Sequence, residues 1–147
     1  MSTHRTILLK GDPLRKEGKA NAAITPGDLI ERMSTGNVRK HASAGQNNNR
    51  LFAVEDDLQG NGVSDNYSTN NKVQFVAARA GDEIYARIAT SQTIVIGDKL
   101  ESAGDGSLRK HTATSAGAVE YPEAIVGIAL EAVTTTSSAG RCEVEVV

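Results

Sequence analysis

The chain contains nearly the same fifteen residues twice, as GDLIERMSTGNVRKH at residues 27–41 and as GDKLESAGDGSLRKH at residues 97–111. The two stretches align without a gap at a constant spacing of 70 positions. Both open with Gly-Asp and close with Arg-Lys-His. A repeat of this length indicates a duplicated structural unit, because similar sequences form similar supersecondary structure.

Each copy has the pattern of a β-hairpin. A turn at residues 34–37 in the first copy and at residues 104–107 in the second separates two short apolar segments. Glycine within such a turn supplies the positive φ that a tight connection needs. We therefore predict that Ile30 and Val38 share one face of the first hairpin. Leu100 and Leu108 do the same in the second.

The similarity continues weakly beyond the hairpins. Residues 51–58 resemble residues 125–133, and residues 72–76 and 141–147 both alternate with the period of a strand. No segment shows an apolar stripe at helical spacing. These features predict an all-β fold, a small β-barrel or sandwich of eight to ten strands with a pseudo-two-fold internal repeat. The repeat copies are expected around residues 27–76 and 97–147.

The first 26 residues have a different character. One apolar patch, Ile7 to Leu9, is followed by a basic stretch, and neither a helical nor a strand period persists. We expect residues 1–26 to form an extended N-terminal arm outside the core of a barrel domain at residues 27–147. A disordered tail is the alternative interpretation.

Composition limits the possible functions. The net charge of −2 gives no general attraction to nucleic acid or to an anionic membrane, so neither is expected as a partner. No apolar run approaches the ~20 residues of a membrane span, and the N-terminal apolar stretch is short for a secretory signal. Cys142 alternates with Val144 and Val146, which indicates a buried strand position rather than a reactive thiol.

No candidate active site emerges from the residue pattern. His41 and His111 are equivalent in the repeat, but each lacks a nearby His, Cys or Asp at ligand spacing, so a solvated strand end or a subunit contact is expected. The acidic run Glu55-Asp56-Asp57 lacks the spacing of a known calcium loop. We therefore expect a protein that is not an enzyme and has no cofactor, catalytic residue or metal site.

The order of several segments resembles capsid decoration (cement) proteins of tailed bacteriophages. The matching segments are ILLKGDPLRKE (7–17), AGDEIYARIA (80–89), the second hairpin, AIVGIALEAV (124–133) and RCEVEVV (141–147). This resemblance implies a small β-fold that binds the outside of an expanded icosahedral head. It also implies that the protein bridges neighbouring major capsid subunits and has no catalytic residues.

The resemblance implies partners and a location. The partners are the major capsid protein and the chain itself, as a trimer or otherwise a dimer. The location is the outer capsid surface of the virion, after synthesis in the bacterial host cytoplasm. An arm that orders on the capsid fits this function, and its expected capsid-binding residues are Ile7, Leu8, Leu9, Lys10, Arg15 and Lys16.

Two other interpretations remain open at this point. A small ligand-binding β-barrel domain unrelated to virions requires a pocket with convergent polar groups, and the sequence indicates none. A secreted adhesive or fibre-tip module is disfavoured by the short N-terminal apolar stretch.

Overall fold

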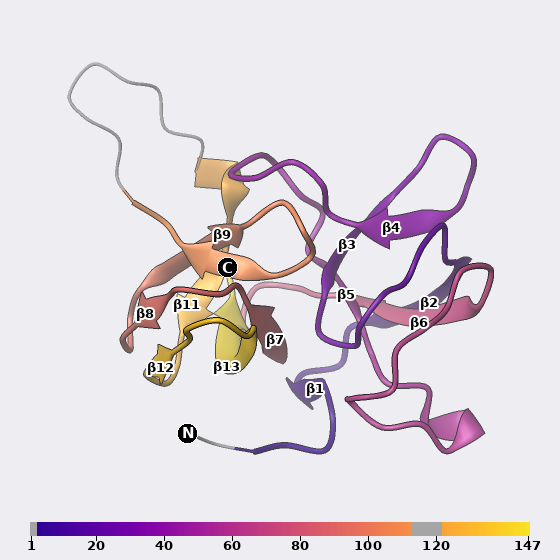
Figure 1. Ribbon diagram of the computed structural model, residues 1–147, viewed down its shortest axis with the longest axis horizontal. Coiled ribbons are helices and arrows are strands. Elements are labelled where there is room, and N and C mark those ends of the chain that lie inside the picture. Colours follow the sequence, from indigo (N-terminus) through magenta and orange to yellow (C-terminus); the bar gives the residue numbers. More distant parts are fainter. Residues whose placement is uncertain (1–2, 113–121) are drawn as a thin grey trace.

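Two small β-barrels lie side by side in the computed structural model, which describes residues 3–112 and 122–147 (Figure 1). The strands of the first barrel, in spatial order, are β2 (Leu14–Lys19), β6 (Lys72–Ala77), β5 (Leu51–Ala53), β3 (Leu29–Arg32) and β4 (Val38–Lys40). A parallel bridge between Ala20, directly after β2, and Val38 of β4 closes this barrel.

The second barrel follows the same plan. Its strands, in spatial order, are β7 (Glu83–Ile88), β13 (Gly140–Val146), β11 (Ile125–Ala129), β9 (Lys99–Ser102) and β10 (Leu108–Lys110). A parallel pairing of β10 with β7 closes the ring. Three short strands complete the set: β1 (Leu8–Lys10), which is antiparallel to β7, and the pair β8 (Thr93–Ile94) and β12 (Val133–Thr134).

The all-β prediction is confirmed. The described residues contain thirteen strands, two 3-10 turns at Asp57–Gln59 (η1) and Pro122–Ala124 (η2), and no α-helix. The expected eight to ten strands were too few, because β1 and β2 lie in the region expected to be an arm and β8 and β12 contain only two residues each. Strands of this length are too short to show a period-two pattern in the sequence.

The two repeated stretches form hairpins with the same strand register. In the first, Glu31 is paired with Arg39, and in the second Glu101 is paired with Arg109. An ion pair joins the side chains in each case, with nitrogen–oxygen distances of 3.0 and 2.8 Å. The hairpins also share a positive φ, at +91° for Gly36 and +86° for Gly106. The hairpin prediction is therefore confirmed.

The duplication is longer than the sequence indicated, since it includes the first strand of each barrel. The bridge from Ala20 to Val38 in the first barrel corresponds to the pairing of Ile88 with Leu108 in the second. The strand pairings show which residues of the two copies are equivalent. Their residue numbers differ by 70 in the hairpins and by 68 between β2 and β7. They differ by 69 between β6 and β13 and by 76 between β5 and β11. The copies therefore span residues 14–77 and 83–146.

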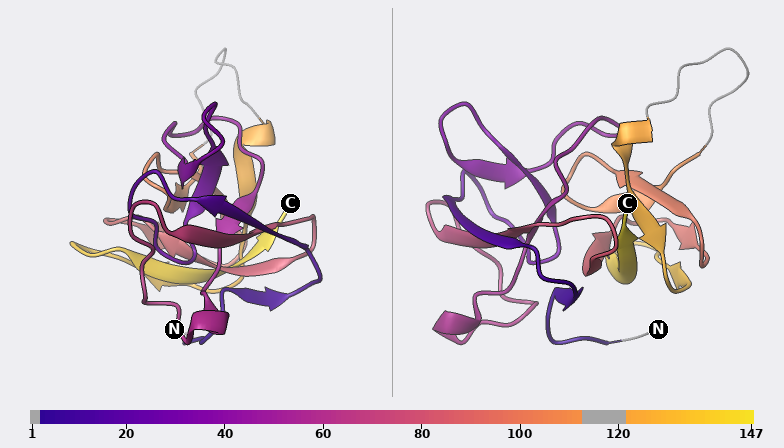
Figure 2. Two further views of the ribbon diagram at one scale, coloured as in Figure 1. Left: turned by 90° about the vertical axis from the view of Figure 1, so that its right-hand side faces the viewer. Right: turned by 180° about the vertical axis from the view of Figure 1, so that it is seen from behind.

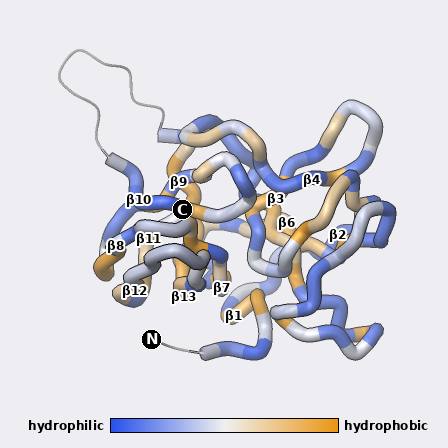
Figure 3. The backbone as a smooth tube through the Cα atoms, viewed as in Figure 1, coloured by the Kyte–Doolittle hydropathy of each residue, from blue (hydrophilic) through white to orange (hydrophobic). Residues whose placement is uncertain are grey.

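Each barrel has its own apolar interior, so the chain does not form the single barrel that the repeat suggested. The interior of the first barrel contains Ala20, Ile24, Ile30, Val38, Leu51, Ala53, Tyr67, Val73 and Phe75. Equivalent positions in the second barrel hold Ile88, Ile94, Leu100, Leu108, Gly127, Ala129, Val133, Cys142 and Val144, and all of these except the glycine belong to the larger core cluster. The hydropathy colouring shows apolar strands, such as β3, joined by polar loops (Figure 3).

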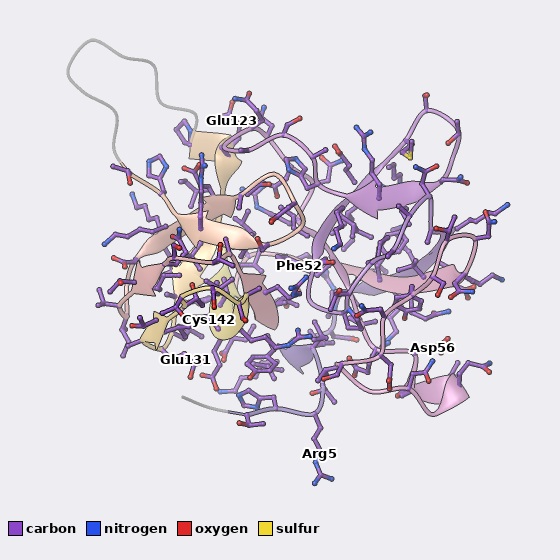
Figure 4. All side chains as sticks on the ribbon, viewed as in Figure 1. Arg5, Phe52, Asp56, Glu123, Glu131 and Cys142 are labelled. Atoms are coloured by element: carbon purple, nitrogen blue, oxygen red, sulfur yellow. The ribbon has the colours of Figure 1, made fainter. Side chains whose placement is uncertain are left out.

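The barrels are joined by apolar and polar contacts. Phe52, which is fully buried, lies between them (Figure 4). Its neighbours on the outer face of the first barrel share the core cluster of the second, and these are Leu29, Val54, Val76 and Ala78. The backbone N–H of Leu29 donates to the carbonyl of Gly106 at 2.7 Å, and that of Arg87 donates to the carbonyl of Gly27 at 3.2 Å.

The predicted repeat of two units is confirmed, but the contact between the units is head-to-tail and not two-fold. A two-fold axis requires every contact between the copies to occur twice, with the roles exchanged. Gly27 and Gly106 lie against residues of the opposite barrel. Their equivalents Gly97 and Gly36 have no described atom within 4 Å of the point where a Cβ would lie. The first barrel therefore uses one face for the contact, and the second barrel uses a different one.

The prediction that residues 1–26 lie outside the core is wrong for the part that the structure describes, residues 3–26. The indigo chain runs from β1, at the edge of the second barrel, into β2 of the first (Figure 2). Ile7, Ala20 and Ile24 are each at most 1 % exposed. No period was visible because β1 is a three-residue strand with a bulge and β2 is polar on both faces. Residues 1–2 lie outside the described residues.

Candidate functional site

The acidic and histidine side chains of the described residues do not gather into a metal site. No group of three or more His, Cys, Asp and Glu side chains there is arranged to hold a metal ion. The acidic run at residues 55–57 is divided, because Glu55 turns inward and accepts the backbone N–H of Ile7 at 2.9 Å. Asp57 begins the turn η1. None of the described helices is long and apolar enough to cross a membrane.

The most deeply buried charge lies between the barrels. Asp28 is fully buried, and its carboxylate oxygens lie 3.2 Å from Arg87 Nη1 and 3.6 Å from Lys40 Nζ. It also accepts the backbone N–H of Thr25 at 2.8 Å. Burial raises the pKa of Asp28, although these partners act in the opposite direction. Because Asp28 is fully buried and has partners in both barrels, its carboxylate joins the barrels.

The two repeat-equivalent histidines do not form a pair. His41 is buried, with Nδ1 2.7 Å from Ser102 Oγ and Nε2 2.9 Å from the carbonyl oxygen of Asn47. His111 lies on the second hairpin, with Nδ1 2.6 Å from Glu101 Oε1. The prediction of a solvated strand end is wrong for His41, because the contact between the barrels covers it. Both rings have structural partners on their own chain.

The single cysteine is an interior residue, as predicted. Cys142 lies on β13 and is fully buried in the second barrel (Figure 4). Burial raises the pKa of its thiol to about 11. Because the thiolate is the reactive form, a thiol with this pKa is inert at neutral pH.

Two shallow hollows of the described surface lie on the first barrel. The larger, of about 570 Å³, is lined mainly by polar side chains, among them Asp56, Asn61, Asn66, Asn71 and Gln74. The smaller, of about 360 Å³, lies beside β2 and is lined by Glu17, Gly18, Lys19, Asn70 and Lys72. Every buried side-chain nitrogen and oxygen in the described part of the chain has a hydrogen-bond partner, so neither hollow contains an orphaned polar group aimed at a ligand.

The structure separates the six predicted capsid-binding residues. Ile7 is fully buried between the barrels and presents no surface to a partner. Leu8 and Leu9 are half-buried against the larger core, and the ammonium of Lys10 lies 3.8 Å from the carboxylate of Glu83. Arg15 and Lys16 are exposed on β2. The exposed members therefore belong to two different strands.

One edge of β2 is unpaired over most of its length. Ala20 donates to Asn71 across the β2–β6 pair, so in an antiparallel ladder the backbone groups of Arg15, Glu17 and Lys19 point away from β6. The side chains along this strand carry a net positive charge from Arg15, Lys16 and Lys19 against Glu17. We call β2 together with Lys72 of β6 the basic edge.

Sequence reasoning missed a second exposed feature, at the turn before β9. Val95 and Ile96 are 52 % and 70 % exposed, although both are large and apolar. The strand β8 ends just before them, at Ile94. The Gly-Asp that follows was the available signal, since it marks the same turn in both repeats.

Comparisons with known proteins give one result on the fold. No family model and no curated protein matches the chain. Among solved structures, the chain is similar to the head fiber gp8.5 N base of bacteriophage phi29, with a TM-score of 0.56 and 11 % sequence identity. The match covers 91 % of this chain and 93 % of that one. At this identity the similarity shows a common fold.

Proposed function

We propose that this chain is a structural protein of a tailed-phage virion that binds the outer surface of the expanded capsid. In this proposal it bridges neighbouring major capsid subunits. The observation that carries the proposal is the common fold with the phi29 head fiber base over nearly the whole of both chains. The resemblance of its segments to capsid decoration proteins supports the same role.

Stabilisation by such a protein has a simple physical basis. A protein that binds the expanded lattice and not its separated subunits stabilises the lattice by mass action. Repeated weak contacts become effective when one assembly touches several capsid subunits at once, because each further contact is intramolecular. We therefore propose self-association as well, as a trimer or otherwise a dimer.

The exposed part of the N-terminal region is the proposed capsid contact. Arg15 and Lys16 are exposed on β2, and Leu14 beside them is 64 % exposed. An exposed apolar side chain flanked by cations supplies desolvation energy together with electrostatic steering. Lys10 and the half-buried Leu8 and Leu9, on β1, are the other proposed contact residues. Ile7 is not part of it, because it is fully buried.

Co-sedimentation with expanded capsids tests the proposal. We expect the wild-type protein to sediment with the capsids and the variant Arg15→Glu/Lys16→Glu to lose most of this binding. The matched control is Arg5→Glu/Arg79→Glu, which makes the same change in net charge at two other exposed arginines. Circular dichroism establishes that each variant is folded. If the wild-type protein stays in the supernatant, the proposed function is wrong. If both variants bind like the wild type, the contact lies elsewhere on the surface.

A further inference from the structure

The head-to-tail contact inside the chain leaves one copy of each contacting face uncovered. The first barrel contacts the second through the Gly27–Asp28 turn and its neighbours, which we call the donor face. The second barrel receives it with β7, β13 and the Gly106 turn, which we call the acceptor face. The equivalent donor face of the second barrel and the equivalent acceptor face of the first are exposed.

The exposed acceptor face coincides with the end of the basic edge that carries Lys19 and Lys72. Arg87, which pairs with Asp28, has Lys19 as its equivalent, and Arg141, which donates to the carbonyl of Pro26 at 2.7 Å, has Lys72. Both positions keep their positive charge. The backbone N–H of Lys19 points away from β6, as that of Arg87 points away from β13 to reach Gly27.

The exposed donor face is the turn before β9. Asp98 is the equivalent of Asp28 and forms the same turn, accepting the backbone N–H of Val95 at 2.9 Å. Its carboxylate lies 3.2 Å from Lys110, as that of Asp28 lies beside Lys40. The exposed apolar residues Val95 and Ile96 are on this same turn. Among the described residues, Asp98 therefore lacks the second cation that Arg87 gives to Asp28.

We propose that a second copy of this chain docks at the end of the basic edge that carries Lys19 and Lys72, by repeating the internal contact between the barrels. In this arrangement Asp98 of one copy pairs with Lys19 of the next, and Lys72 donates to the carbonyl of Ile96. The contact joins two different faces, so copies join head-to-tail and close into a ring when the rotation permits. In a trimer, three chains of two barrels place six barrels in one ring.

The contact between chains is weaker than the contact within the chain. Leu29 and Val76 of the internal donor face are replaced by Lys99 and Glu145 at the equivalent positions of the second barrel. Loss of two buried apolar side chains lowers the affinity and increases the electrostatic share of the binding energy. The association is therefore reversible, concentration-dependent and weakened by salt.

A charge-reversal cycle measured by sedimentation velocity tests this docking mode. The inference rests on the self-association proposed above, but it needs no capsid. We expect Lys19→Glu and Asp98→Lys each to weaken the association about tenfold or more, since like charges then oppose each other across the contact. The double variant Lys19→Glu/Asp98→Lys restores an attractive pair in reversed order and should associate more tightly than either single variant. Arg5→Glu, an exposed cation outside both faces (Figure 4), should associate like the wild type.

The outcomes distinguish self-association itself from the head-to-tail contact. If the wild type associates and the single variants associate equally well, self-association holds and the head-to-tail contact is wrong. If both single variants weaken association but the double variant does not recover it, the two residues do not pair with each other, and the proposed contact is again wrong. A wild type that remains monomeric at high protein concentration and low salt overturns both. Circular dichroism on each variant excludes loss of folding as the cause.

Discussion

The carboxylate of Asp28 in the first barrel lies 3.2 Å from the guanidinium of Arg87 in the second, and Asp28 is fully buried. This pair shows most clearly that the two copies of the duplicated unit have different surroundings. Asp98, the equivalent carboxylate, has the same turn and the same lysine partner but, in the described part of the chain, no arginine from another barrel. The same sequence motif therefore joins the barrels in one copy and faces outward in the other.

The buried position of Asp28 predicts an unequal effect of two equivalent mutations. Asp28→Ala removes the partner of Arg87 and the acceptor for Thr25 N–H, so we expect a loss of about 2 kcal/mol in the free energy of unfolding. Asp98→Ala should cost less, about 1 kcal/mol, because only its own turn and Lys110 are affected. Urea denaturation of both variants checks the order. Equal losses would mean that the contact with Arg87 contributes little.

Asp28 also predicts a pH effect. Its pKa is raised in the folded protein by burial, so the folded state takes up this proton at a higher pH than the unfolded state does. The contribution of Asp28 to stability is therefore largest below its unfolded pKa and is lost as the pH rises through the folded one. Acidification from about pH 6 to pH 4 should destabilise the wild type less than Asp28→Asn, which does not titrate at this position. Thermal melts at both pH values give the comparison, and a larger loss in the wild type would contradict it.

Two equivalent glycines provide a matched pair for measuring the contact between the barrels. Gly36 and Gly106 both have positive φ, so replacing either with alanine introduces a similar backbone strain of about 1 kcal/mol. A Cβ at Gly106 would also lie 2.9 Å from Asp28 Cγ and 3.0 Å from Lys40 Cγ, whereas one at Gly36 meets nothing within 4 Å. We expect Gly106→Ala to be more destabilising than Gly36→Ala by about 1 kcal/mol or more. If chemical denaturation shows equal losses in the free energy of unfolding, the first barrel can move away from the Gly106 turn without a loss of stability.

The Cys142 thiol should be unreactive until the second barrel unfolds. Its burial raises the thiol pKa to about 11, so little thiolate exists at pH 8, and the side chain is fully buried. An aromatic disulfide reagent at pH 8 should label the native protein far more slowly than the protein in denaturant. The rate of labelling should increase along the same urea curve as the loss of strand structure. Rapid labelling of native protein would show that β13 opens locally.

The sequence determined the local structure of the hairpins but not the relation between the copies. A Gly-Asp turn, a positive-φ glycine and paired charges such as Glu31 with Arg39 depend on neighbours close in the chain, so they could be predicted. Whether the copies form one barrel or two depends on the closing bridge between Ala20 and Val38. That bridge involves single residues, and it leaves no periodic signal in the sequence.

The surface was harder to predict than the fold. Exposed residues such as Lys19 and Asp98 are individually ordinary, and their possible role follows only from comparing equivalent positions in the two barrels. The apolar run at Ile7 to Leu9 was interpreted as an anchor for a partner. A short apolar segment has the same pattern whether it binds another protein or its own chain, and Ile7 is in contact with its own chain.

The N-terminal region is expected to be essential for folding, contrary to its predicted role as a separable arm. Deleting residues 2–24 removes β1, β2 and the bridge that closes the first barrel, so we expect loss of cooperative unfolding rather than an intact barrel.

Because so large a deletion affects many contacts, Ile7→Ala tests separately whether the N-terminal region is part of the core. Ile7 is fully buried and its backbone bonds to Glu55 and Tyr85, so truncation should cost about 2–4 kcal/mol. The matched control is Leu14→Ala, at a side chain that is 64 % exposed in the same region, with an expected change below about 0.5 kcal/mol. Urea denaturation followed by circular dichroism measures both. If Ile7→Ala is as stable as the control, Ile7 does not contribute to the core and the N-terminal region is not essential for folding.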